Sequence, residues 1–512
     1  MREYIITVKD PNVWNTSLWN ELTVNGLGDN YIPKRAVEVT NERPFNDYAA
    51  HFNLTDEEAD LIRQDSRILN VELNPDLDDS LIKDHFGTRS LYTYDKSNTT
   101  VNNMKNWGLI RANSLSNPFS ASTTLNSEFT YNLDGTGVDI IVMDTGVDPD
   151  HPEFAVNADG TGGSRVVNFD WFSLGVPGVP TGESINGYLG DYDGHGSNCA
   201  SIAAGNTCGW ARGAQIYSIR INLGSGPFND IRTGVTLGTI SSTYAYDLVR
   251  AFHLKKLTDG NTRPTICTNS WGYSRTFSTS TMQAIFYRGT RYTVTSPQPQ
   301  YGQIGSSNPV CILSVDQSVN NASNAGVIMV GASGNSSYKI DVPGGLDYDN
   351  YYDTTVSTYN YYHRGSSPVS ASSMISVGAI DNSTVEQKVY FSNCGPRIDI
   401  YSPGTMIMGA YANKTYRTPA VADTRNNLHY LNKISGTSQA TPQVTGLLAC
   451  VLQARPKMTT TEAKEFLIES SIKNVLQVSG VESYTNTTSL QGSSNRTLYM
   501  PFNSSIRGSI NS

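Results

Sequence analysis

The sequence predicts an α/β fold, a mostly parallel β-sheet flanked by helices, preceded by a small α+β domain. Strand-like and helix-like segments alternate along most of the 512 residues, which is typical of a parallel sheet with crossover helices. Several apolar runs end in a polar residue and a turn, as buried parallel strands do. Residues 1–73 differ, because their strands and helices follow the order of a compact α+β unit.

One apolar run, residues 137–143, leads directly into Asp144 and a turn at Gly146. It predicts a buried parallel strand with Asp144 at its carboxyl end, where open α/β sheets place their sites. Taken alone, the Asp144 carboxylate could equally cap the turn.

Two polar residues are predicted at helix starts. His195 lies between glycines, and the small residues after it predict a helix. Ser438 follows a tight turn at Gly436, and Pro442 comes early enough to be tolerated in the first turn of the next helix. A hydroxyl there lies beside unpaired backbone N–H groups, which suits a nucleophile that must stabilise an oxyanion. Each residue alone could be structural, Ser438 as an N-cap and His195 as a packed side chain.

The chain order acid, imidazole, hydroxyl is one of the known arrangements of a serine triad. Asp144, His195 and Ser438 occur in that order, each in a suitable local context. Three such matches are far less expected by chance than any one of them. The sequence therefore predicts Ser438 as nucleophile, His195 as general base and Asp144 as the acid that orients it.

With these motifs the chain resembles the subtilisin-like serine peptidases, most of all their proteinase K branch. The resemblance implies a serine endopeptidase that forms an acyl-enzyme, acts on protein or peptide substrates and needs no cofactor for the chemistry. It also implies that the side-chain amide of Asn335 contributes to an oxyanion hole. The matching motifs are residues 143–147 with 151–154, 193–196, 330–335 and 436–442.

The same resemblance implies how a substrate is held. Members of the family bind an extended peptide between two backbone edges, while pockets for alternate side chains set the preference. Trp271, one of the matching residues, could equally pack in the core. The residues carried over are Gly224, Ser225 and Gly226 on one edge, Ser270, Trp271 and Gly272 on the other, and Ala332, Ser333 and Gly334 before Asn335.

Residues 1–78 are predicted to form the N-terminal domain. A capping box of Thr55 with Glu58 predicts a helix over residues 54–62. Through residues 48–58 the domain resembles the ferredoxin-like inhibitory propeptide of the same family. The resemblance implies a zymogen that its own N-terminal domain inhibits until autoprocessing; a permanent interaction module is the alternative.

The rest of the chain is divided by composition. Residues 79–105 are predicted to be a polar connector that carries the processing site. The peptidase domain is predicted over residues 106–502, with a polar tail at 503–512. Two long polar insertions interrupt it, residues 274–310 and 337–372, and loops of such length usually carry function or are disordered.

The second insertion contains Asp347, Asp349 and Asp353. Their carboxylates could bind a structural calcium ion, which takes several oxygen ligands. A solvated acidic loop is the favoured interpretation, because no ligand-loop pattern is present.

Composition argues against several classes of protein. The net charge of −9 argues against nucleic acid as a main partner. No apolar run approaches about 20 residues, so no membrane span is expected. Residues 1–20 show no signal peptide, which favours the cytoplasm or a virus particle over classical secretion. Reduced thiols are expected, although Cys208 or Cys450 could pair with another cysteine.

The chain departs from the family pattern near two of the motifs. Ser197 and Asn198 stand where Thr-His is usual, and Gln439 stands where Met is usual. Asn198 is expected to alter the fit of the substrate rather than the triad chemistry. Cys199 matches the free cysteine of the proteinase K branch, which implies inhibition by a mercurial; an inert buried residue is the alternative.

Two other functions compete with a peptidase. A non-catalytic structural or adhesive protein, for example of a virus particle, would suit the low charge and the abundant Tyr, Asn, Ser and Thr. Such a protein would have no physical need to keep Asp144, His195, Asn335 and Ser438 together. A lipase or esterase is disfavoured, because no Gly-x-Ser-x-Gly elbow surrounds Ser438.

Overall fold

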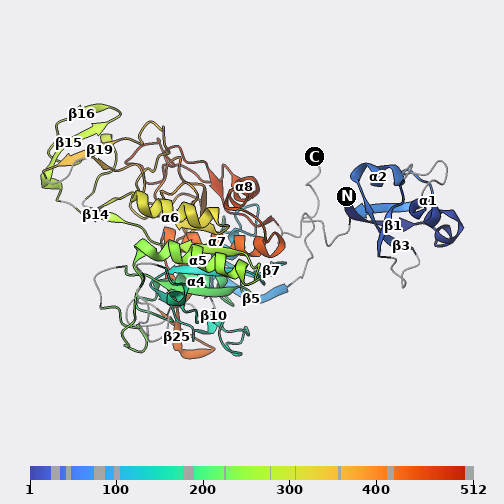
Figure 1. Ribbon diagram of the computed structural model, residues 1–512. Helices are drawn as coiled ribbons and strands as arrows, with labels where there is room; N and C mark the ends of the chain where they lie inside the picture. The colour runs from blue at the N-terminus through green and yellow to red at the C-terminus, as the bar shows by residue number, and fades with distance from the viewer. Residues whose placement is uncertain are drawn as a thin grey trace. The chain divides into compact units, whose positions relative to one another are not determined.

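The computed structural model (Figure 1) describes most of the chain. It covers residues 1–24, 35–41, 48–73, 87–96, 104–176, 179, 189–223, 227–276, 278–305, 307–355, 359–411 and 420–501. The chain divides into two compact units, Met1–Lys83 and Asp84–Ser512. Of the predicted segments, the tail at 503–512 lies outside the described residues.

The N-terminal unit has the predicted α+β architecture. Its antiparallel sheet has the strand order β2-β3-β1-β4, and the chain runs βαββαβ, the ferredoxin-like order. The capping box of Thr55 and Glu58 is present at the start of α2. Ile6, Phe52 and Ile62 are fully buried in one core between sheet and helices. The elements are β1 (Arg2–Val8), η1 (Trp14–Leu18), α1 (Trp19–Thr23), β2 (Glu38–Asn41), β3 (Ala49–Leu54), α2 (Asp56–Ile62) and β4 (Ile68–Leu73).

A large, almost wholly parallel sheet forms the centre of the second unit. In the described part of that unit nine strands pair in the order β10-β12-β8-β13-β18-β21-β22-β27-β26. Each neighbouring pair is parallel except β26 with β27. Their bounds are β8 (Asp139–Asp144), β10 (Val166–Val167), β12 (Gln215–Arg220), β13 (Thr265–Asn269), β18 (Ile328–Ala332), β21 (Ile375–Ile380), β22 (Ile400–Pro403), β26 (Ile472–Lys473) and β27 (Arg496–Thr497).

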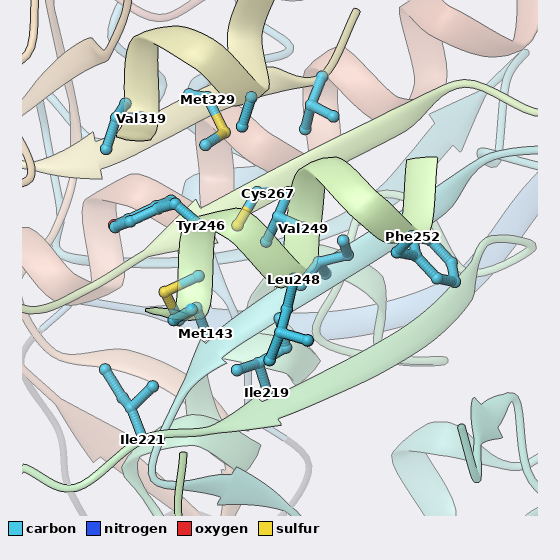
Figure 2. Close-up of a cluster of buried hydrophobic side chains, with 14 of the residues drawn as sticks. Met143, Ile219, Ile221, Tyr246, Leu248, Val249, Phe252, Cys267, Val319 and Met329 are labelled. Atoms are coloured by element: carbon cyan, nitrogen blue, oxygen red, sulfur yellow. The ribbon is translucent and has the colours of Figure 1, made fainter. Parts of the chain in front are cut away.

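Helices cover both faces of this sheet, so the predicted α/β fold class is confirmed. Ile141 and Met143 of β8 face the core beneath α5 and α6 (Figure 2). Because side chains alternate along a strand, Ile140 and Val142 face the opposite side, where α4 and α7 pack. These helices touch closely: a Cβ on Gly446 would lie 2.3 Å from the Ala203 oxygen. The helices are α4 (His195–Ala204), α5 (Ser242–Thr258), α6 (Leu313–Asn324), α7 (Thr437–Ala454) and α8 (Thr460–Ser470).

Part of the predicted connector is a strand. Residues 87–95 form β5, which pairs antiparallel with β7 and parallel with β6. Residues 79–86 and 97–103 of that connector lie outside the described residues. The smaller elements nearby are β5 (Gly87–Asp95), β6 (Met104–Lys105), α3 (Trp107–Arg111), β7 (Thr124–Tyr131), β9 (Gly146–Val147), η2 (Pro152–Phe154), η3 (Trp171–Leu174), β11 (Gly190–Asp191), β23 (Ile407–Tyr411), β24 (Val421–Asp423) and β25 (Asn426–Ile434).

The two polar insertions fold together rather than apart. Strands from both make one antiparallel sheet, β16-β15-β19-β20, with its own small core around Ile285 and Tyr362. Figure 1 shows β15, β16 and β19 gathered at one end of the unit. The insertion elements are β14 (Ser274–Thr276), η4 (Thr279–Thr281), β15 (Met282–Tyr287), β16 (Thr290–Tyr292), η5 (Pro299–Tyr301), β17 (Ser307–Pro309), β19 (Tyr351–Thr354) and β20 (Asn360–Tyr361).

The interpretation of the acidic cluster as a solvated loop is wrong for Asp347. Its carboxylate is fully buried and bonds to Arg288 and Lys339, at 2.7 and 2.5 Å. Asp349 pairs with Arg364 at 2.5 Å. Protein cations therefore already balance two of the three carboxylates that were considered for calcium.

Two further observations bear on the sequence predictions. Cys208 carries a free thiol, so it does not form the disulfide considered for it. Within the described residues, no helix combines the length and the apolarity that a membrane crossing requires.

Candidate active site

The predicted site residues gather at the carboxyl edge of the parallel sheet. Strand β8 ends at Asp144, β13 leads into Ser270, and β18 leads into Asn335. Helices α4 and α7 begin at His195 and Thr437, directly above the same edge. Neighbouring parallel strands end together, so one sheet edge collects residues that are far apart in the sequence.

Asp144 and His195 form a direct hydrogen bond. His195 Nδ1 lies 2.7 Å from Asp144 Oδ1, which also accepts the Thr145 N–H at 2.8 Å. Burial by itself would lower the pKa of His195, but the Asp144 carboxylate outweighs it and holds the pKa well above its ordinary value. With Nδ1 facing the carboxylate, Nε2 is the nitrogen left to exchange a proton.

Ser438 is the second residue of α7, and its hydroxyl is 3.1 Å from the Ser270 carbonyl oxygen, to which it donates. Among the described residues, this is the one hydrogen bond of the Ser438 hydroxyl. No hydrogen bond joins that hydroxyl to His195 there. Cys199 links the two regions: its sulfur lies 3.9 and 4.0 Å from the two His195 nitrogens and donates to the Ser438 carbonyl at 3.4 Å. One buried thiol thus contacts both the His195 ring and the Ser438 backbone.

Pro442 is the sixth residue of α7, so the prediction that it lies in the first turn is wrong. The helix begins one residue before Ser438, because Asn335 Oδ1 accepts the Thr437 N–H at 2.8 Å. Since proline has no N–H, it cannot bond to the carbonyl four residues earlier, that of Ser438. The Ser270 hydroxyl takes that place at 3.0 Å, which the sequence did not predict.

Asn335 presents a side-chain amide beside Ser438. Its Oδ1 accepts hydrogen bonds from the Thr437 N–H at 2.8 Å and from the Thr437 hydroxyl at 2.9 Å. Nδ2 is therefore the end of the amide that does not face Thr437. A Cβ on Gly436 would lie 3.4 Å from Asn335 Nδ2 and 3.5 Å from Ser438 N. Both donors therefore border one small space, and within the described residues neither has an acceptor. Such a pair of donors can bind an oxyanion.

A pocket of about 240 Å³ opens beside Ser438 and Asn335. Trp271 lines it and also stacks on Tyr246 of the core, with ring centroids 6.3 Å apart, so it packs on the core and still reaches the pocket; its role in substrate binding stays a prediction. Ser333 is buried and does not line the pocket. The predicted residues that do line it are Ser270, Trp271, Gly272, Ala332 and Gly334. Gly224, Ser225 and Gly226 lie outside the described residues.

The sequence did not predict that an insertion supplies the wall of this pocket. Strands β14 and β17 pair so that Arg275 is opposite Asn308. The pocket is lined by four residues of this two-stranded sheet, Ser274, Ser307, Asn308 and Pro309. The only signal was the length of the insertion, which indicates function without indicating a place.

Two of the departures from the family pattern contact each other. Gln439 Nε2 donates to Asn198 Oδ1 at 3.2 Å, and both side chains are buried. Asn198 therefore lies between the helices that carry His195 and Ser438, not against the substrate pocket. The expectation that it alters the fit of the substrate is not supported by this position.

The chain is similar in sequence to several proteins that are named subtilisin-like or alkaline proteases. A subtilisin-like serine protease of Cochliobolus lunatus, Cur l 4.0101, is 26% identical over 353 residues, covering 68% of this chain and 50% of the relative. Alkaline protease 2 of Aspergillus fumigatus is 26% identical over 377 residues, 73% of this chain and 56% of the relative. The chain spans about half the length of these relatives. A subtilisin-like protease of Coccidioides posadasii is 24% identical over 491 residues, 92% of this chain and 75% of the relative.

A solved structure and a family model complete the comparison. A cold adapted subtilisin-like serine proteinase superposes with a TM-score of 0.46 at 21% identity, covering 77% of this chain and 97% of that one. The model of the Subtilase family, Peptidase_S8, matches residues 135–497, which is more than half of the chain. The chain belongs to the subtilase family.

Proposed function

We propose that the protein is a serine endopeptidase in which Ser438 is the nucleophile, His195 the general base and Asp144 its orienting partner. The observation that carries the proposal is the hydrogen-bonded Asp144–His195 pair beside a serine at a helix start, which faces a pocket. Family membership and relatives that are named serine proteases support it. The non-catalytic alternative is not favoured.

The first chemical step requires one small movement. Ser438 Oγ leaves the Ser270 carbonyl and turns to His195 Nε2, which takes its proton as the oxygen attacks a peptide carbonyl. The developing negative charge on the carbonyl oxygen is bound by the Ser438 N–H and the Asn335 amide. His195 then gives the proton to the leaving amine, and water hydrolyses the acyl-enzyme by the same steps.

The environment of His195 favours this chemistry. The Asp144 carboxylate accepts the Nδ1 proton, so Nε2 carries the lone pair that can take the Ser438 proton. The same carboxylate stabilises the imidazolium that forms during attack, which is why the pKa of His195 is raised. Asp144 is buried and His195 is only partly exposed, so solvent screens this interaction less than it would a pair on the surface.

The pocket suggests which substrates are accepted. It adjoins Ser438 and Asn335, so it receives the side chain of the residue whose carbonyl is attacked. No charged residue is found among its described lining. Burying an unpaired charge there would be costly, so we infer a preference for neutral side chains before the cut. Peptides with Lys or Glu at that position, cleaved as fast as those with Gln or Leu, would contradict this inference.

The N-terminal unit is proposed to be an inhibitory propeptide that the enzyme removes. Its βαββαβ order and the capping box at Thr55 support the resemblance on which this proposal rests. N-terminal sequencing and mass spectrometry of the purified protein test it. Intact chain with full activity would speak for a permanent domain instead.

The experiment for the main proposal is Ser438→Ala. A loss of turnover of about 10⁶-fold is expected, a figure measured on subtilisin, a member of the same family. An unchanged melting temperature shows that the fold is intact. A fluorophosphonate should label the wild-type chain at Ser438 and leave the variant unlabelled. If the wild-type chain is not labelled either, the result supports the non-catalytic alternative.

A further inference from the structure

Asp191 is a fully buried carboxylate behind the Asp144–His195 pair. It ends β11, where it is paired with Gly146 of β9. The proposed mechanism gives it no role, although it accepts an unusual number of hydrogen bonds. Oδ1 accepts from Thr145 Oγ1 at 2.8 Å, Asp193 N at 3.0 Å and Gly194 N at 2.8 Å, and Oδ2 accepts from Ser197 N at 2.9 Å and Ser197 Oγ at 2.7 Å.

These bonds replace a missing helix cap. Helix α4 begins at His195, and its N-cap Gly194 has no side chain to accept the first N–H groups. Gly194 also has φ of +94°, which favours glycine and so prevents a capping side chain at this position. Asp191 accepts the N–H groups of Gly194 and Ser197, while Thr145 Oγ1 accepts that of Gly196 at 2.8 Å. The first turn is thus held from outside the helix.

The same bonds join the two sides of the acid–base pair. Thr145 directly follows Asp144, and its own N–H donates to Asp144 Oδ1 at 2.8 Å. Gly194 and Gly196 directly precede and follow His195. A second path therefore runs from Asp144 to His195 through Thr145 and Asp191, parallel to the direct 2.7 Å hydrogen bond.

We propose that Asp191 is a positioning residue for the reaction. It fixes the backbone of His195 relative to Asp144, and so the direction in which Nε2 faces Ser438. This inference rests on the proposed peptidase function. The expected loss of rate when Asp191 is replaced follows from geometry, because a misplacement of about 1 Å at a reacting group can cost about 10²-fold in rate.

The test is Asp191→Asn in the full chain. The amide keeps the shape of the side chain, but its NH₂ group cannot accept from the backbone N–H groups on the side that it faces, so at least one of these N–H groups loses its acceptor. We expect kcat to fall by about 10- to 100-fold while KM stays within about threefold. We also expect the low-field proton resonance of the His195–Asp144 hydrogen bond to shift or broaden.

Asp399→Asn is the matched control. Asp399 is also a buried carboxylate, bonded to Ser376 N at 2.9 Å and to Arg397 at 3.0 Å, but it lies before β22 at the other edge of the sheet. Its loss should lower the melting temperature without changing kcat or the low-field resonance. If both variants lose kcat in proportion to their melting temperatures, Asp191 is only a structural cap and the proposal fails.

A second pair of variants decides the question if Asp191→Asn does not fold. Thr145→Val removes the hydroxyl that bridges Gly196 and Asp191 but keeps the branched shape, whereas Thr145→Ser keeps the hydroxyl. Valine should lower kcat by about tenfold and serine should restore most of it. Equal kcat in valine, serine and wild type would overturn the proposal. Should the wild type itself hydrolyse no peptide, the peptidase function fails, but the low-field resonance still tests what Asp191 positions.

Discussion

The two halves of the site differ in how completely their polar groups are hydrogen-bonded. In the acid–base half, Asp144 and His195 are joined directly, and Thr145 and Asp191 hold the turn behind them. In the nucleophile half, Ser438 donates to the Ser270 carbonyl, and two donors beside it have no acceptor among the described residues. The first half is complete as it stands, whereas the second is completed by a substrate carbonyl.

In the proposed mechanism, this difference follows from what each half does. The acid–base half must keep one tautomer and one direction through the whole cycle, so fixed hydrogen bonds favour it. The nucleophile half must bind charge that exists only in the transition state, so its donors gain by waiting without partners. Variants in the two halves should therefore fail in different ways, which the following predictions use.

The largest effect is expected from Asp144→Asn, which breaks the acid–base half. We expect kcat to fall by about 10⁴-fold, because the amide favours the wrong tautomer of His195. The pH profile should change as well. The neutral imidazole is the active form, so wild-type kcat/KM rises as pH rises through the raised pKa of His195. Without the carboxylate this pKa falls, and the acid limb of the profile should move to lower pH.

Asp139→Asn gives a control at the opposite end of the same strand. Asp139 is buried and pairs with Lys256 and Arg263, away from His195. The variant should be less stable, but its acid limb should stay at the wild-type pH. If the acid limb of the pH profile shifts in this variant too, the shift reflects a general loss of stability and not the loss of the Asp144 charge.

The next largest effect is expected in the nucleophile half. Asn335→Asp keeps an acceptor for the Thr437 N–H and hydroxyl but replaces the amide donor by a carboxylate. We expect kcat to fall by at least about 10²- to 10³-fold, the cost of losing one oxyanion donor as measured on subtilisin, with little change in KM.

Asn335→Ala separates the two roles of this side chain. It loses both the donor and the acceptor, so it should also lower the melting temperature by weakening the start of α7. An Asn335→Asp variant that kept kcat at the wild-type level would remove Asn335 from the oxyanion hole.

A smaller effect is expected where the two halves meet. Gln439 and Asn198 bond to each other between the helices that carry Ser438 and His195. Gln439→Met and Asn198→His should each cost stability, and the double variant should recover part of it, with a coupling energy of about 0.5–3 kcal/mol in denaturant unfolding.

A pair of residues that do not touch supplies the comparison. Gln453 lies at the far end of α7, where it accepts the N–H groups of Asp134 and Gly135 at 2.9 and 2.8 Å. Gln439→Met combined with Gln453→Ala should be additive within about 0.5 kcal/mol. Additivity in the Asn198 pair too would mean that the two departures arose independently of each other.

The smallest perturbation concerns the thiol between the halves. Cys199 lies about equally far from the two nitrogens of His195, and burial raises its pKa, so it is a neutral thiol at pH 7. A mercurial should inhibit slowly by binding there, although the proposed nucleophile is Ser438. Cys199→Ala should abolish this sensitivity. Cys208→Ala, at another buried thiol, should keep it; the reverse result would place the reactive thiol elsewhere.

The acid–base half was the easier one to predict from the sequence. Asp144 follows an apolar run and His195 lies between glycines, so local pattern alone indicates a strand end and a helix start. The start of α7 at Thr437 was harder, because there the Thr437 N–H donates to Asn335 Oδ1, 102 residues away in the sequence.

What the sequence did not predict are contacts between distant segments. The Gln439–Asn198 bond joins two helices, and the pocket wall depends on how β14 pairs with β17. Burial of Asp347 was missed for the same reason, since Arg288 lies in the other insertion. A run of polar residues indicates exposure only until a partner from elsewhere in the chain is known.

The two-stranded sheet of β14 and β17 is separate from the large parallel sheet of the unit. These two strands contribute Ser274, Asn308 and Pro309 to the pocket, but they lie outside the large sheet that ends at Asp144 and outside helix α7, which carries Ser438. If the proposed peptidase function holds, changes in these two strands can therefore alter which peptides are cut while Asp144, His195 and Ser438 stay unchanged. Evolution, or a protein engineer, could exchange this one wall as an independent part.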